Sequence, residues 1–142
     1  MANCVVNWRG KEIKFRTDPY EVYGRMVRIL PWLHKRKFPN VTEEMQQAKC
    51  EEEIGELGVA YGKYILEPEL DKITEQRKEY YFEMADVWFA ISGMYRFNMD
   101  AAEGYLNKLS MYPCWPEIGI PLMIEKLLEV YFIRTYVNNR HI

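Results

Sequence analysis

Two long segments with helical periodicity, separated by Pro68, most constrain the fold of this chain. The first follows Thr42, a favourable N-cap residue with acidic neighbours for the first turn, and runs to about Leu66. The second spans about residues 69–97. Because helices joined by a short connection usually pack side by side in opposite directions, the connection at 67–74 predicts antiparallel neighbours.

Prolines and capping residues divide the rest of the chain into shorter helices. The pair Asp18-Pro19 predicts a helix start, and Pro31 predicts the end of that helix. Asp100 and Glu103 have the spacing of a capping box, which predicts another start. The expected helices cover residues 19–30, 100–113 and 121–138, with loops over 31–40 and 113–121.

The first residues alternate imperfectly between apolar and polar. Residues 4–16, around Arg9-Gly10, fit a short β-hairpin or an extended arm. The whole pattern predicts an all-α fold, an antiparallel bundle of about five helices, and 142 residues suit a single domain. Within residues 1–142 we expect an N-terminal arm over 1–17, a core over 42–110 and an extra C-terminal helix over 121–138.

Composition excludes several classes of protein. Lys and Arg total 19 against 21 Asp and Glu, a net charge of −2, which argues against binding to duplex DNA through bulk positive charge. The three cysteines form no CxxC motif and the two histidines lie far apart, so neither a disulfide framework nor a zinc site is expected. No signal peptide and no run of about 18 apolar residues is present. We therefore expect a cytoplasmic protein without a membrane span.

Each long helix carries a pair of acids three residues apart. Glu53 and Glu56 lie on the first, and Glu83 and Asp86 on the second. Antiparallel packing would bring the four carboxylates together, where they would repel one another strongly unless a cation lay among them. Carboxylate oxygens are hard ligands that suit Mg²⁺ or Mn²⁺. The sequence therefore predicts a metal site between the two helices.

Each pair also has a purely structural explanation. Glu53 and Glu56 alone are typical of a solvated helix face. Asp86 is the only charge between Met84 and Tyr95, which predicts that it is buried, and a buried carboxylate needs a cation, a shell of hydrogen bonds or a salt bridge to Arg or Lys. Small residues on the same helices would allow close helix approach or leave space for a ligand. They are Gly55, Gly58, Gly62, Ala90 and Gly93.

The two acidic motifs resemble a known family. KCEEEIGELGVA (49–60) and YYFEMADVWFAIS (80–92) are similar to the MazG-like superfamily of all-α nucleoside triphosphate pyrophosphohydrolases, over about residues 42–110. The resemblance implies Mg²⁺, or Mn²⁺, as cofactor and cleavage of a nucleoside triphosphate to the monophosphate and pyrophosphate. It also implies a homodimer or higher oligomer. The metal ligands that it implies are Glu53, Glu56, Glu83 and Asp86.

Other site residues are candidates on the same basis. Glu52 would serve with Glu53 as a catalytic acid or base, and Lys49 and Lys108 would contact phosphate. Apart from the resemblance, an aromatic ring could stack on the base, and the candidates are Trp32, Trp88 or a tyrosine, with Trp88 also explained as a core residue.

A second hypothesis belongs to a different class: a catalytically inactive helical binding or regulatory module. The segment after Lys108 lacks the Asn and Arg that the family often has there, and the basic segment His34–Lys37 would contact a nucleic acid or another partner. A di-iron carboxylate bundle is disfavoured, since neither histidine follows a motif glutamate by three residues. Large apolar residues in 121–138 also favour self-association. They are Leu127, Leu128, Tyr131, Phe132 and Tyr136.

Overall fold

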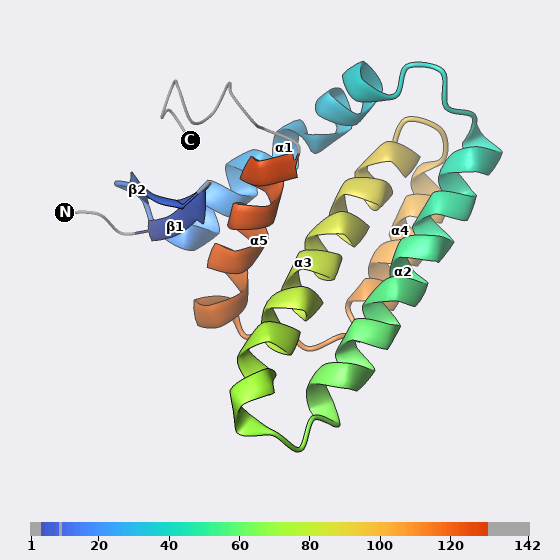
Figure 1. The fold of residues 1–142 in the computed structure, drawn as a ribbon. Helices are drawn as coiled ribbons and strands as arrows, with labels where there is room; N and C mark the ends of the chain where they lie inside the picture. The colour runs from blue at the N-terminus through green and yellow to red at the C-terminus, as the bar shows by residue number, and fades with distance from the viewer. Residues whose placement is uncertain (1–3, 9, 131–142) are drawn as a thin grey trace. The chain divides into compact units, whose positions relative to one another are not determined.

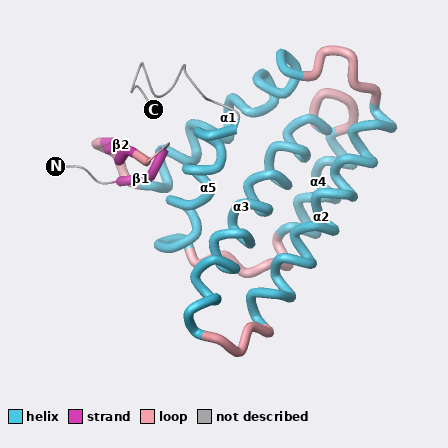
Figure 2. The backbone as a smooth tube through the Cα atoms, viewed as in Figure 1, coloured by secondary structure: helices cyan, strands magenta, loops and turns pink. Residues whose placement is uncertain are grey.

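A computed structural model describes residues 4–8 and 10–130. Over this part of the chain the elements are β1 (Cys4–Trp8), β2 (Lys11–Phe15), α1 (Pro19–Lys37), α2 (Glu43–Ile65), α3 (Leu70–Met94), α4 (Met99–Leu109) and α5 (Pro116–Val130) (Figures 1 and 2). The predicted all-α class with a short hairpin is confirmed. In the same residues no helix has both the length and the apolar character needed to cross a membrane.

Contacts group the described chain into two compact units. One holds the residues up to Ile29 and those from Cys114 onward, and the other spans Leu30–Pro113. The expectation of a single domain stays a prediction, and each unit is described by itself.

The first unit contains the hairpin and α5. β1 and β2 are antiparallel, with Cys4 opposite Phe15 and Val6 opposite Ile13. All four of these side chains are buried, so one face of the hairpin is apolar and covered, and β1 packs against α5. Gly10 sits in the turn with a φ of 78°, a conformation that glycine adopts without strain. The first residues therefore form a hairpin and not an extended arm.

Helix α5 begins earlier than the sequence predicts. The loop expected over 113–121 is wrong from Pro116 onward, and Pro121 lies inside the helix. A proline is tolerated at the first helical position, and burial of Ile120, Met123 and Ile124 offsets the hydrogen bond lost at Pro121. The part of the expected helix over 131–138 lies outside the described residues.

The second unit is built on the pair α2 and α3. Thr42 caps α2 as predicted, since its Oγ1 accepts a hydrogen bond from the Met45 amide at 3.2 Å. After a short connection at 66–69 the chain reverses, and α3 runs antiparallel along α2 (Figure 1). The predicted antiparallel pairing is confirmed.

Helix α4 has a different cap from the one predicted. Asn98, in extended conformation, accepts a hydrogen bond from the Ala101 amide through its Oδ1 at 3.0 Å, so the cap lies two residues before the predicted cap Asp100 and the helix begins at Met99. Asn and Asp are nearly equal as N-caps, so a capping-box spacing alone does not choose between them. The helix ends at Leu109, short of Pro113.

The end of α1 belongs to the second unit, and the loop predicted over 31–40 is wrong as far as Lys37. Pro31 lies inside the helix, which continues to Lys37. Leu30 and His34 are fully or almost fully buried, and the His34 ring lies 5.3 Å from the ring centroids of Phe38 and Phe89. This burial offsets the helix-breaking cost of proline, about 3 kcal/mol.

His34 is therefore not one of four exposed cationic groups in a loop. Burial and the nearby Arg96 guanidinium lower the pKa of His34 to about 4, so its imidazole is neutral at pH 7. Its Nδ1 lies 3.2 Å from Arg96 Nη1, which donates a second hydrogen bond to the Phe38 carbonyl. The remaining charges, Lys35 to Lys37, follow in the last turn of α1, where cations offset the helix dipole. The basic segment thus has a structural explanation.

Candidate metal centre

Three of the four predicted acids meet between α2 and α3, and the fourth, Glu56, groups instead with acids of its own helix. Glu53, Glu83 and Asp86 each place a carboxylate oxygen within 4.8 Å of the other two. Glu52, Glu53 and Glu56 form a second such group along α2, so Glu53 belongs to both. Antiparallel packing of two helices with i, i+3 pairs on their facing sides accounts for this convergence.

Glu53 is the most buried acid of the centre, with 7% of its surface exposed. Its Oε1 forms an ion pair with Lys49 Nζ at 3.0 Å, whereas its Oε2 is buried without a hydrogen-bond partner in the described part of the chain. Burial raises the pKa of this carboxyl, the Lys49 hydrogen bond opposes that effect, and the neighbouring Asp86 raises the pKa further. The ionised form of Glu53 is thus costly in this environment.

Glu83 also has a raised pKa. Its pKa is raised to about 8, first by burial and then by a hydrogen bond with Glu79 and the charge of Asp86. Its Oε2 is also buried with no hydrogen-bond partner among the described residues. Without a cation, this carboxyl holds its proton at pH 7.

Asp86 is partly buried, not fully buried as its apolar surroundings in the sequence predict. It lies one turn after Glu83 on the same face of α3, the face that meets the acids of α2. That position keeps its carboxylate at the edge of the packed core.

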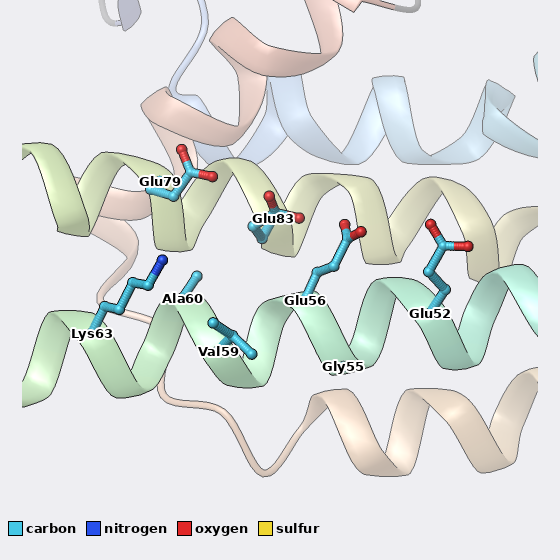
Figure 3. Close-up of a pocket in the computed structure, with 8 residues that line it drawn as sticks. All are labelled: Glu52, Gly55, Glu56, Val59, Ala60, Lys63, Glu79 and Glu83. Atoms are coloured by element: carbon cyan, nitrogen blue, oxygen red, sulfur yellow. The ribbon is translucent and has the colours of Figure 1, made fainter.

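An open pocket of about 540 Å³ lies beside the acids, between α2 and α3 (Figure 3). The residues that line it are Glu52, Gly55, Glu56, Val59, Ala60, Lys63, Glu79 and Glu83. Lys63 and Glu79 are not among the site residues predicted from the sequence. A signal for both existed: Lys63 follows Glu56 by two helical turns, and Glu79 precedes Glu83 by one turn, so both lie on the motif faces.

The small residues divide into two groups. A Cβ added at Gly93 would lie 2.4 Å from His34 Nε2, and one at Gly58 would lie 3.0 Å from the Tyr112 hydroxyl, so these glycines permit close packing. Gly55 and Gly62 have open space where a Cβ would be. Gly55 therefore leaves room beside the acids, as the sequence suggested for a ligand.

The predicted substrate contacts do not all meet at the centre. Lys49 is half exposed and pairs with Glu52 at 3.4 Å as well as with Glu53. Lys108 is on α4, with its ammonium 5.6 Å from the Tyr105 ring centroid, and it does not line the pocket. Trp32 is on α1, 58% exposed and covered on one side by the Arg36 guanidinium, and it does not line the pocket either.

Comparisons of the chain with protein-family models, with curated proteins and with solved structures found no match. Its function must therefore be inferred from the chemistry of the acidic centre and from the two motifs that form it.

Proposed function

We propose that this protein is a Mg²⁺-dependent nucleotide pyrophosphohydrolase that cleaves a nucleoside triphosphate to the monophosphate and pyrophosphate. The observation that carries the proposal is the meeting of Glu53, Glu83 and Asp86 within 4.8 Å, although Glu53 is almost fully buried. Buried polar atoms left without partners each cost about 1–3 kcal/mol. A carboxylate cluster of this kind is stabilised when a cation binds to it.

The donor set fits Mg²⁺ or Mn²⁺. Both groups of acids consist of glutamate and aspartate alone, and oxygen ligands without sulfur or imidazole suit these hard cations. The raised pKa values of Glu53 and Glu83 fit as well, because carboxyls that hold protons in the absence of metal release them when a cation binds. Glu53, Glu56, Glu83 and Asp86 would hold the ions.

The surrounding residues suit hydrolysis of a polyphosphate. Mg²⁺, when bound, neutralises phosphate charge and makes water more acidic. Glu52 is exposed at the pocket and can accept a proton from water there, while Lys49 holds the Glu53 carboxylate in place. The pocket volume of about 540 Å³ is within the range of small-molecule sites.

Substitution of Asp86→Asn tests the proposal. We expect the wild type to release pyrophosphate from at least one member of a nucleoside triphosphate panel only when Mg²⁺ is present. The variant keeps the shape of the side chain, loses its charge and should be slower by at least about 100-fold. Asp71→Asn is the matched control, because Asp71 is an exposed residue in the first turn of the same helix. A wild type without this activity, or an Asp86→Asn protein as active as Asp71→Asn, would refute the proposed activity.

The predicted homodimer or higher oligomer is part of this proposal. Leu127 and Leu128 are already fully buried within the chain, so they do not require a partner. Tyr131, Phe132 and Tyr136 lie outside the described residues. Light scattering at tens of micromolar should give at least twice the mass of one chain, and a monomeric mass would contradict the prediction.

A further inference from the structure

Lys63 is the one cationic side chain among the described residues that line the pocket. Four carboxylates share that lining: Glu52, Glu56, Glu79 and Glu83. Lys63 nevertheless forms no ion pair within 4.0 Å in the described chain, whereas Lys49 is paired with two glutamates. An ammonium in acidic surroundings that pairs with none of them is available to another anion.

Lys63 is separated along α2 from the acids of that helix. It follows Glu56 by seven residues, which is about 10 Å along a helix axis. Helical side chains lean toward the N-terminus of their helix, and the Lys63 ammonium accordingly lies beside Ala60, on the side of α2 that faces α3 (Figure 3). Glu52 marks the opposite end of the pocket.

Between Glu56 and Lys63 the α2 side of the pocket is apolar. Val59 and Ala60 line this part, and neither supplies a charge. A chain of phosphates that began at the acids and followed the pocket along α2 would find its next cation at Lys63. The same chain would pass Glu79, which makes an opposing positive charge necessary at this point.

We propose that Lys63 binds the terminal part of the substrate polyphosphate, the part that leaves as pyrophosphate. The proposal rests on the proposed function, since Glu53 and its neighbours must first hold the cation that allows a polyanion to approach. Glu53, which does not itself line the pocket, supports the bound cation independently of the lysine: more than nine-tenths of its surface is buried, and its Oε2, unlike the Oε1 paired with Lys49, has no hydrogen-bond partner in the described chain. The nucleoside is then directed toward the Glu52 end of the pocket.

Binding of inorganic pyrophosphate, measured by titration calorimetry in the presence of Mg²⁺, tests this assignment. Lys63→Met keeps the apolar stem and removes the charge, and it should weaken pyrophosphate binding about tenfold, the scale of one hydrogen bond to a charged group. Lys63→Arg restores a cation and should bind within a few-fold of the wild type. Lys72→Met is the matched control, since Lys72 is an exposed lysine on α3 that pairs with Glu69 outside the pocket.

Titration of Mg²⁺ alone and thermal melts complete the experiment. Both should be unchanged in Lys63→Met, because this lysine touches no acid of the metal group. Equal pyrophosphate affinity in Lys63→Met and the wild type would overturn the proposal, and so would a wild type that binds no pyrophosphate with Mg²⁺ present. A loss in Lys63→Met that Lys63→Arg does not recover, accompanied by a lower melting temperature, would also overturn it.

The two proposals fail in different ways. If the wild type hydrolyses triphosphates but Lys63→Met binds pyrophosphate normally, the proposed activity stands and the proposed role of Lys63 is wrong. If the wild type binds pyrophosphate through Lys63 but hydrolyses no triphosphate, the proposed activity is wrong and the anion site stands.

Discussion

Substitution of Glu53→Gln should stabilise the metal-free protein and remove its response to Mg²⁺. Glu53 is almost fully buried, has a carboxylate oxygen within 4.8 Å of oxygens of Glu83 and Asp86, and has one oxygen without a hydrogen-bond partner among the described residues. The variant keeps the size of the side chain and removes the negative charge. Repulsion within the cluster therefore falls, and so does the affinity for a divalent cation.

The magnitude follows from the distances. Two unit charges 4.8 Å apart repel by about 3 kcal/mol at an effective dielectric constant of about 20. The partner charge in this sum is Asp86, which is among the causes that raise the pKa of Glu53, because the pKa of Glu83 near 8 keeps that carboxyl largely neutral at pH 7. Loss of the pair with the half-exposed Lys49 offsets about 1 kcal/mol. The net gain is about 2 kcal/mol, or a rise of about 5 °C in the melting temperature.

Excess Mg²⁺ should reverse the order of the two melting temperatures, those of the wild type and of Glu53→Gln. A cation at about 1,000 times its Kd stabilises the native state by about 4 kcal/mol, so wild type with Mg²⁺ should melt above the variant. Thermal melts in EDTA and in excess Mg²⁺ measure both differences on the same samples.

Glu52→Gln is the control for the ion pair. It also loses a contact with Lys49, at 3.4 Å, but its side chain is 57% exposed, so its stability in EDTA should stay within about 0.5 kcal/mol of the wild type. If Glu53→Gln melts below the wild type in EDTA, Glu53 serves mainly as a partner for Lys49, and repulsion among the carboxylates does not dominate the stability of the metal-free protein.

Two further predictions concern packing and pH. Gly93→Ala places a Cβ 2.4 Å from His34 Nε2, so we expect a loss of about 1–3 kcal/mol in urea unfolding, whereas Gly62→Ala, with open space, should gain up to about 1 kcal/mol. Equal stability of the two variants would contradict the close approach at Gly93. Stability of the metal-free protein should fall as pH rises toward 8, because folded Glu83 has a pKa of about 8 against an ordinary 4.5 and so keeps a proton that the unfolded chain has lost. Thermal melts in EDTA from pH 6.5 to 8 measure this slope. That range lies above the one in which His34 titrates, between about 4 and 6.5. Glu83→Gln should flatten the slope. A wild-type slope as flat as that of the variant would count against the raised pKa.

The parts of the fold predicted correctly depend on signals that act over a few residues. Thr42 caps α2 through an amide three positions away, and the i, i+3 acid pairs follow from the geometry of a single helix. Antiparallel pairing of α2 and α3 then brings the acids together without further information. The metal itself and the reaction stay predictions.

The errors arise where distant packing overrides a local signal. Pro31 and Pro121 both predict helix ends, yet both lie inside helices because neighbouring side chains such as Leu30 and Ile124 are fully buried. Sequence alone does not show which apolar residues will be covered. Lys63 escaped prediction for another reason, since its signal is its spacing from Glu56 on one face and not a motif of its own.

The location of all four acids on one helical hairpin has a consequence for how the chain folds. A contact between helices joined by the short connection at 66–69 is local in sequence, and local contacts form early and fast. Docking of α2 on α3 also brings like charges together, so we expect their repulsion to oppose this step of folding as well as the native state. If a divalent cation binds the carboxylates at that stage, we expect it to accelerate folding.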